Sequence, residues 1–348
     1  MSMRREERDF AESRIAGCLL GGAIGDALGA AIEFVSLDTI RSRFGPDGLT
    51  QFAAAYGRLG AITDDTQMTL FTAEGLLCAR AAHADPSPEQ FVDAIGEAYL
   101  RWLTTQDGSS VDDCGWLADQ PVLRSRRAPG LTCLGALEAG GHGSTSNPLN
   151  DSKGCGAVMR AAPIGLLSAS TFTVGAETGA VTHGHASGYL SSGALAVIVG
   201  DLLRGDALGD AVDHARGELA QWPRHEETLA AIDAAVALAQ RGSPSAETVE
   251  TLGAGWVGEE ALSIAIYCAL VSSDVHQGLA LAVNHSGDSD STGSIAGNLL
   301  GAMHGVDALP SEVLAELEAR DIIEEIATDL SLTFIDGLPP SIDRYGDV

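Results

Sequence analysis

Apolar residues recur at helical spacing along most of this chain, and no stretch shows the apolar–polar alternation of a half-buried strand. This pattern predicts helices over residues 12–34, 64–82, 88–105, 157–169, 174–181, 187–204, 208–220, 225–241, 257–272, 274–284, 291–304 and 310–330. Residues 106–114 and 140–156 are rich in turn formers and predict loops. The second loop is long for a compact domain, and such loops are commonly functional. No linker or fixed-period repeat divides the chain, so residues 1–348 are expected to form a single helical domain.

Two of the expected helices carry glycine at every fourth position, which places these glycines on one face. The two stripes are Gly17, Gly21, Gly25 and Gly29, and Gly293, Gly297, Gly301 and Gly305. Each glycine inside a helix costs about 0.5–1 kcal/mol relative to alanine, so close approach of another backbone has to compensate. The two helices are therefore expected to pack closely, either on each other or on different neighbours.

The composition agrees with helices packed through small residues, because aromatic residues make up only 5% of the chain and glycine is abundant. The formal net charge of -28 argues against non-specific nucleic-acid binding and against attraction to an anionic membrane. An anionic small ligand could bind only where metal ions, arginines or helix N-termini make the local electrostatic potential positive. No apolar stretch is long and uninterrupted enough to predict a membrane span.

The six cysteines are scattered without a CxxC pair, which argues against a zinc site. The N-terminus is charged and has no apolar signal core behind it. Free thiols and the lack of a signal predict a cytoplasmic protein, which we expect to be a monomer.

Two short acidic clusters precede expected helices, at Thr63-Asp64-Asp65 and at Asp288-Ser289-Asp290-Ser291. Each alone is typical of an N-cap, since Asp, Ser and Thr are the preferred capping residues. If the clusters meet, four carboxylates at one place require cations. Carboxylate and hydroxyl oxygens suit hard divalent ions, so Mg²⁺ or Mn²⁺ is favoured over Zn²⁺.

Two other interpretations of the second cluster fail on single residues. Asp288-x-Asp290-x-Thr292-Gly293 matches the first half of a calcium-binding EF-hand loop, but the last loop position holds Leu299 instead of the required Glu. The same run matches the DxDxT of enzymes that form an aspartyl phosphate. Those enzymes need a downstream lysine, and the only lysine, Lys153, lies upstream.

Taken together, the motifs resemble the ADP-ribosylglycohydrolase family over nearly the whole chain. In order, they are GCLLGGAIGDALGAAIEF, TDDTQMT, GCGAVMRAAPIGL, THGH, GWVGEEAL and GDSDSTGSIAGNLLGA. The resemblance implies an all-α, single compact orthogonal multi-helix domain of that type, with two Mg²⁺ or Mn²⁺ ions. The implied metal ligands are Thr63, Asp64, Asp65, Asp288, Asp290 and Ser291.

The resemblance also implies a substrate-binding loop and catalytic carboxylates. The loop that holds the phosphates and adenosine maps onto Ser152, Lys153, Gly154, Cys155 and Gly156, with His183 near the diphosphate and distal ribose. Relatives often have Asn at Cys155 and an aromatic residue at Lys153, whose ammonium could instead pair with a phosphate. Glu33 matches a glutamate that one branch uses beside the metals, and Asp64 and Asp65 are the other candidate acid–base groups. Asp26 could orient a ligand or loop, and Trp256 is interpreted as structural.

The implied reaction is hydrolysis of the glycosidic bond at C1″ of ADP-ribose, released from a modified protein or a small-molecule acceptor. Two alternatives stay open at this point. One is an ADP-ribose or nucleotide binding module without catalysis. The other is a metal-dependent phosphohydrolase that cuts the diphosphate and releases AMP.

Overall fold

The computed structural model describes residues 5–106 and 115–346, and these residues form helices joined by loops. The first half contains α1 (Arg5–Gly29), α2 (Leu37–Phe44), α3 (Asp64–Ala82), α4 (Pro88–Gln106), α5 (Gly115–Ala118), η1 (Pro121–Leu123), α6 (Leu131–Glu138), η2 (Cys155–Arg160), η3 (Ala162–Leu166) and α7 (Thr171–Ala180). The second half contains α8 (Ala186–Arg204), α9 (Leu208–Leu219), α10 (Glu226–Ala239), α11 (Ala246–Glu250), α12 (Gly258–Val271), α13 (Val275–Val283), α14 (Ser289–His304), η4 (Val306–Ala308), α15 (Ser311–Glu316), α16 (Arg320–Leu330), η5 (Ser331–Ile335) and α17 (Ile342–Tyr345). The predicted all-α fold is confirmed. The predicted loop at 106–114 lies, apart from Gln106, outside the described residues.

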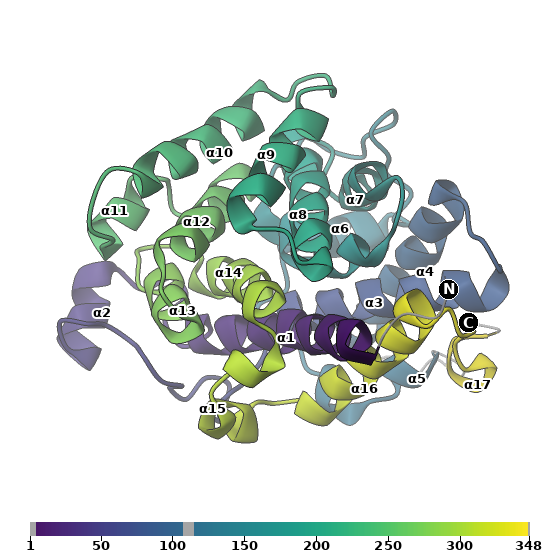
Figure 1. Ribbon diagram of the computed structural model, residues 1–348, viewed down its shortest axis with the longest axis horizontal. Coiled ribbons are helices and arrows are strands. Elements are labelled where there is room, and N and C mark those ends of the chain that lie inside the picture. The colour runs from purple at the N-terminus through teal and green to yellow at the C-terminus, as the bar shows by residue number, and fades with distance from the viewer. Residues whose placement is uncertain (1–4, 107–114, 347–348) are drawn as a thin grey trace.

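The two glycine-striped helices pack directly on each other, side by side at the centre of Figure 1. A Cβ added to Gly17 would lie 2.5 Å from the Gly301 carbonyl oxygen, and one added to Gly25 would lie 1.9 Å from that of Gly293. The two helices run antiparallel, because residues later in α1 contact residues earlier in α14. Of the two arrangements left open by the sequence, the mutual contact is confirmed. The end of α1 therefore lies beside the beginning of α14.

Helix α8, which lies above this pair in the view of Figure 1, is buried along most of its length. It is 19 residues long and, by length and composition, apolar enough to cross a membrane. However, 94% of its apolar stretch is buried inside the protein. The core helix of a globular domain has the same character. Around it, α7, α9 and α12 cover the apolar surface that α8 presents.

Two predicted helices are wrong in detail. The segment 157–169 forms the 3₁₀ turns η2 and η3, because Pro163 lacks the N–H that a continuous α-helix would use. The segment 310–330 is interrupted between α15 and α16, where Ala319 has a φ of +58° and the Glu318 N–H donates to the Gly60 carbonyl. The second break satisfies a contact with a distant part of the chain that periodicity does not reveal.

Sequence reasoning also missed α2 and α6. Helix α2 has a recognisable start, since the Ser36 hydroxyl accepts a hydrogen bond from the Thr39 N–H. Helix α6 follows Gly130 without a side-chain cap, so its start carries no such signal. The predicted helix at 12–34 begins earlier, at Arg5, and its regular part ends at Gly29. Residues 30–33 then form turns that lead into the candidate site.

Candidate functional site

The two acidic clusters stand at the beginnings of α3 and α14. Thr63 is the N-cap of α3, where its hydroxyl accepts a hydrogen bond from the Asp65 N–H at 3.3 Å. Asp288 occupies the N-cap position of α14, but its side chain makes no capping bond to that helix. The packing of α1 on α14 brings Gly29 against Ser289, so the end of α1 joins the same place.

Asp26 links α1 to the start of α3. Its buried carboxylate accepts hydrogen bonds from the Thr63 N–H at 3.0 and 3.1 Å and from the Thr63 hydroxyl at 2.8 Å. It also accepts from the Thr66 N–H at 3.1 Å and from the Thr66 hydroxyl. The expectation that Asp26 orients a neighbouring loop therefore agrees with its contacts. Asp26 fixes the position from which Thr63, Asp64 and Asp65 project.

The carboxyl groups from the three helix ends gather at one site. Oxygen atoms of Glu33, Asp288 and Asp290 all lie within 4.8 Å of one another. The two aspartates are buried, while Glu33 is half-buried at the edge. Asp65, also buried, has a carboxylate oxygen, Oδ1, with no hydrogen-bond partner among the described residues. A buried carboxylate oxygen without a donor is costly, and a cation would satisfy it.

Electrostatics show that the first cluster shares this site. Burial and the nearby Asp290 carboxylate raise the pKa of Asp64, Asp65 and Asp288 well above the ordinary aspartate value. The same two causes raise the pKa of Glu33 to about 10. So many buried carboxylates cannot all ionise without a compensating positive charge. The donors are carboxylate and hydroxyl oxygens, a set that fits hard divalent cations such as Mg²⁺ or Mn²⁺.

The predicted substrate loop lies next to the acidic cluster and is held by backbone contacts. The Cys155 N–H donates to the Trp256 carbonyl at 3.1 Å, and the Gly258 N–H donates to the Lys153 carbonyl at 2.8 Å. The His185 N–H donates to the Ser152 carbonyl at 3.1 Å. The loop is therefore tied to the segments before α8 and α12.

The glycines of the loop allow His183 to pack closely against it. A Cβ on Gly154 would lie 3.2 Å from His183 Nε2, and one on Gly156 would lie 3.1 Å from His183 Cε1. The buried ring of His183 meets the Thr182 hydroxyl through Nδ1 at 2.8 Å. Burial, with the positive charge of Arg160, lowers the pKa of His183 to about 3. A neutral His183 thus borders the loop, and its place near the diphosphate and distal ribose of a substrate stays a prediction.

The ammonium of Lys153 pairs with carboxylates of the protein, whereas the resemblance had suggested that it could pair with a phosphate. Its ammonium forms ion pairs with Glu227 of α10, at 2.6 Å, and with Glu259 of α12. The charge of Lys153 is thereby balanced by two carboxylates. In this structure the side chain anchors the loop to these two helices.

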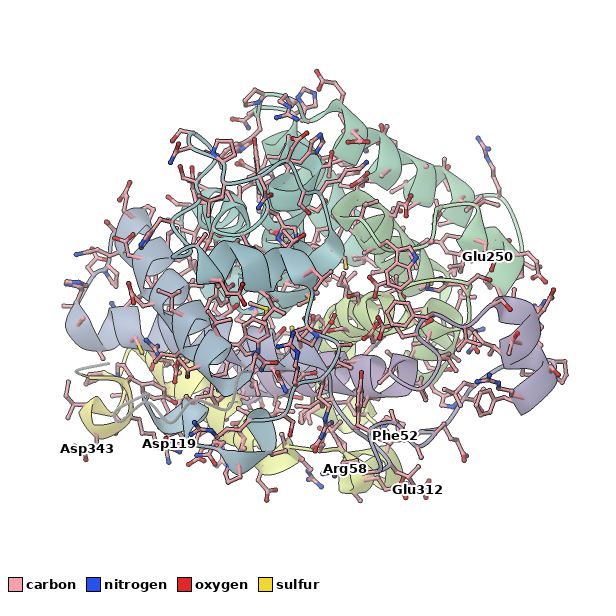
Figure 2. All side chains as sticks on the ribbon, turned by 180° about the vertical axis from the view of Figure 1, so that it is seen from behind. Phe52, Arg58, Asp119, Glu250, Glu312 and Asp343 are labelled. Carbon is pink, nitrogen blue, oxygen red and sulfur yellow. The ribbon has the colours of Figure 1, made fainter. Side chains whose placement is uncertain are left out.

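One supporting network was not foreseen from the sequence. The Asp64 carboxylate accepts the Gly130 N–H at 3.1 Å, and the nearby Arg127 forms an ion pair with buried Glu318 at 2.8 Å. Glu318 also accepts the Ile62 N–H at 3.1 Å and pairs with Arg58, labelled in Figure 2. Arg127 and Glu318 are separated by 191 residues, so no local pattern marks their pairing.

An exposed aromatic pair stands at the border of the site. The rings of Phe34 and Trp256 stack with centroids 5.0 Å apart and planes inclined by 20°. Phe34 directly follows Glu33 and has a φ of +64°, a strained conformation for a non-glycine residue. Trp256, interpreted as structural, thus connects the Glu33 segment to the loop that contains Cys155.

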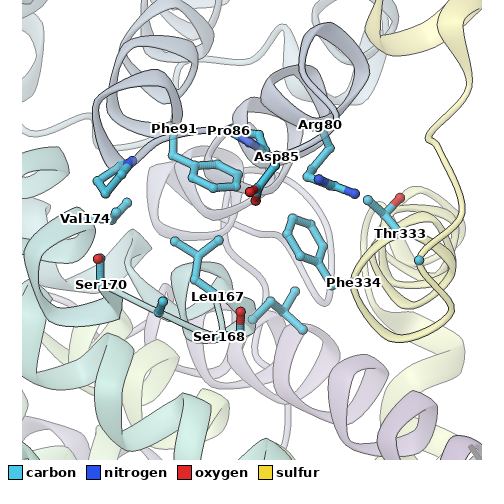
Figure 3. Close-up of a pocket in the computed structure, with 14 residues that line it drawn as sticks. Arg80, Asp85, Pro86, Phe91, Leu167, Ser168, Ser170, Val174, Thr333 and Phe334 are labelled. Atoms are coloured by element: carbon cyan, nitrogen blue, oxygen red, sulfur yellow. The ribbon is translucent and has the colours of Figure 1, made fainter. Parts of the chain in front are cut away.

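A separate pocket of about 340 Å³ lies between α4, α7 and η5 (Figure 3). Phe91, Leu167 and Phe334 line its apolar side, and Arg80 and Asp85 stand at its edge. It contains none of the predicted site residues. The candidate chemistry therefore belongs to the acidic cluster.

Comparison with known proteins agrees with this geometry. The sequence model of the ADP-ribosylglycohydrolase family matches residues 7–337. An uncharacterized protein of Archaeoglobus fulgidus is 29% identical over 92% of this chain and 96% of its own. The ADP-ribosyl-dinitrogen reductase glycohydrolase of Rhodospirillum rubrum is 27% identical over 93% of this chain and 97% of its own.

A solved structure described as an ADP-ribosylglycohydrolase-related protein complex shares the fold. Its TM-score is 0.66 at 24% identity, and the match covers 97% of this chain and 99% of the other. The family match spans almost all of the described helices, from α1 to η5. The chain therefore belongs to the ADP-ribosylglycohydrolase family, whose members are hydrolases that generally depend on divalent metal ions.

Proposed function

We propose that this protein hydrolyses the glycosidic bond at C1″ of the distal ribose of ADP-ribose and releases ADP-ribose from a modified protein or small-molecule acceptor. One observation carries the proposal. The ends of α1, α3 and α14 bring together a buried cluster of carboxylates, and Asp65 Oδ1 in it lacks a donor. Cations in such a cluster would let its carboxylates stay ionised and would supply Lewis acidity to a hydrolase.

Two divalent cations, Mg²⁺ or Mn²⁺, would be held by oxygen atoms from both clusters. The proposed ligands are Thr63, Asp64, Asp65, Asp288, Asp290 and Ser291. When bound, such ions supply Lewis acidity and lower the pKa of a coordinated water. Asp26 supports this set because its bonds to Thr63 hold the start of α3 in place.

Glu33 is the carboxyl best placed to act on the substrate itself. It lies beside Asp288 and Asp290 but is only half-buried, so its side chain faces the accessible edge of the cluster. In the metal-free protein, burial and Asp290 raise the pKa of Glu33. A protonated Glu33 would donate to the departing acceptor atom while positive charge develops at C1″. Asp64 or Asp65 would accept a proton from the attacking water.

The substrate's diphosphate would lie along residues 152–156. The glycines in this loop permit backbone N–H groups to approach phosphate oxygens. Neutral His183 packs against Gly154 and Gly156 and keeps that backbone in place. Lys153 contributes by anchoring the loop through Glu227 and Glu259.

The proposal is tested by incubating the protein with a panel of ADP-ribosylated substrates, in Mg²⁺, in Mn²⁺ and with chelator. The panel includes arginine-, serine- and O-acetyl-linked ADP-ribose, and products are identified by mass spectrometry. We expect metal-dependent release of intact ADP-ribose. Asp290→Asn should abolish release, while Asp343→Asn, an exposed residue in α17 (Figure 2), should leave it unchanged.

Three results would contradict the proposal. Release of AMP instead of ADP-ribose would identify a phosphohydrolase. Binding of ADP-ribose without turnover of any substrate in the panel would identify a binding module. Full activity in the presence of chelator would refute the role of the metals.

A further inference from the structure

The thiol of Cys155 points into the acidic cluster. Its Sγ lies 2.8 Å from Asp288 Oδ2, and the Ser291 hydroxyl lies 3.6 Å from the same sulfur. Of the cysteines in the described ranges, the other four are buried, and Cys155 is half-buried. Its sulfur contacts two residues of the proposed metal-ligand set, Asp288 and Ser291. The sulfur therefore belongs to the site and not to the apolar core.

The backbone fixes this position of the sulfur. Cys155 begins η2, and its N–H donates to the Trp256 carbonyl at 3.1 Å. The preceding residue, Gly154, forms an isolated bridge with Val257. With its backbone held on the α12 side, Cys155 directs its side chain toward the start of α14.

The spacing of the three atoms fits neighbouring ligands of one ion. A metal–oxygen bond of about 2.1 Å and a metal–sulfur bond of about 2.3 Å place the two ligand atoms about 3.1 Å apart at a right angle and about 3.6 Å apart at a tetrahedral angle. The separation of 3.6 Å between the Cys155 sulfur and the Ser291 hydroxyl matches the tetrahedral value, and the thiol donates a 2.8 Å hydrogen bond to Asp288 Oδ2, which already brings the sulfur beside a proposed ligand. The buried Asp65 Oδ1, which has no hydrogen-bond partner among the described residues, independently points to a cation-binding site in the same cluster.

We propose that the Cys155 sulfur is a direct ligand of one of the two cations, next to Asp288 and Ser291. This inference rests on the binuclear site of the proposed function and adds a soft donor to its oxygen ligands. A thiolate shifts the preference of a site from Mg²⁺ toward thiophilic ions such as Co²⁺, Zn²⁺ and Cd²⁺. Binding releases the thiol proton to the solvent, since the ligand is the thiolate.

Cobalt substitution tests this ligand directly. Metal-free full-length protein is titrated with Co²⁺ and followed by absorption spectroscopy. We expect a sulfur-to-cobalt charge-transfer band in the near ultraviolet, together with weaker visible bands from the cobalt ion. Cys155→Ser should lose the charge-transfer band and keep the visible bands. Cys78→Ser, a buried thiol on α3, is the matched control and should retain both.

Calorimetry provides a second measurement. In Cys155→Ser the affinity for Cd²⁺ should fall at least about tenfold, while the affinity for Mg²⁺ changes little. An equal loss for both ions would show that Cys155 only supports Asp288, and it would overturn the proposal.

The spectra also separate this inference from the proposed function. Cobalt binding without the charge-transfer band overturns the sulfur ligand, and release of ADP-ribose with Mg²⁺ would then still support the hydrolase. No cobalt binding at all would overturn the metal site itself and, with it, both proposals.

Discussion

Replacing Gly25 with alanine should separate α1 from α14 and so disturb both stability and the metal site. The new Cβ would lie 1.9 Å from the Gly293 carbonyl oxygen, about 1.5 Å short of the 3.4 Å at which ordinary contacts begin. The obstacle is the backbone of Gly293 and Ser294, which cannot rotate away as a side chain can. Overpacking of this kind costs about 1–3 kcal/mol. The higher helix propensity of alanine returns about 0.5–1 kcal/mol, so the variant should be destabilised by about 1 kcal/mol.

Urea unfolding followed by circular dichroism measures this loss, and calorimetry measures Mn²⁺ affinity of the same samples. Gly96→Ala is the matched control, because Gly96 lies inside α4 and a Cβ there would meet nothing within 4 Å. The control should be slightly more stable than the wild type, with unchanged Mn²⁺ affinity. If Gly25→Ala unfolds at the same urea concentration as the control or a higher one, the reasoning about close backbone packing is refuted.

Three further predictions concern the site. Asp26→Asn removes the charged acceptor of two hydrogen bonds from Thr63. The affinity for Mn²⁺, measured by calorimetry, should therefore fall about 10–100-fold. An unchanged affinity would contradict the role of Asp26 in holding the start of α3. Burial, with the repulsion of nearby Asp290, raises the pKa of Asp26 to about 7 from 3.8. Between these two pH values the folded protein therefore binds more protons than the unfolded chain. The metal-free protein should accordingly lose thermal stability as the pH rises from about 4 to 7. Added Mn²⁺ should reverse that loss, and a chelated protein that is more stable at pH 8 than at pH 5 would count against it. Phe34→Ala removes the stacking on Trp256, so the release of ADP-ribose should slow while the affinity for Mn²⁺ stays the same. An equal loss of release rate and of Mn²⁺ affinity would show that the aromatic pair supports the metal ligands as well.

The long helices were predictable because their signal is local. Helix α3 was expected over 64–82 and is found there, since Thr63 caps it and Met68, Phe71 and Leu76 follow at helical spacing. The break between α15 and α16 was not predictable, because a distant contact prevails there over the local pattern. Between α15 and α16 the chain breaks so that Glu318 can reach the Gly60 carbonyl and the Ile62 N–H.

The candidate site divides in the same way. Residue type and spacing identified both acidic clusters as sources of oxygen ligands. The assignment of their residues as metal ligands stays a prediction. The partners of Lys153 could not be read from the sequence, because Glu227 and Glu259 lie 74 and 106 residues away. The approach of Cys155 to Asp288 likewise joins residues 133 positions apart.

By itself, the sequence determined that the protein is helical, that two helices carry glycine faces, and that oxygen-bearing residues precede two helix starts. These features follow from periodicity and capping, which act over a few residues. Only the tertiary structure decided that the two glycine faces pack on each other. That contact sets the register in which Gly29 meets Ser289, and with it the convergence of Glu33, Asp288 and Asp290. Asp26 then adds the start of α3 to the same place through Thr63. The physical reason is that backbones separated by more than 200 residues can approach so closely only where both surfaces lack side chains.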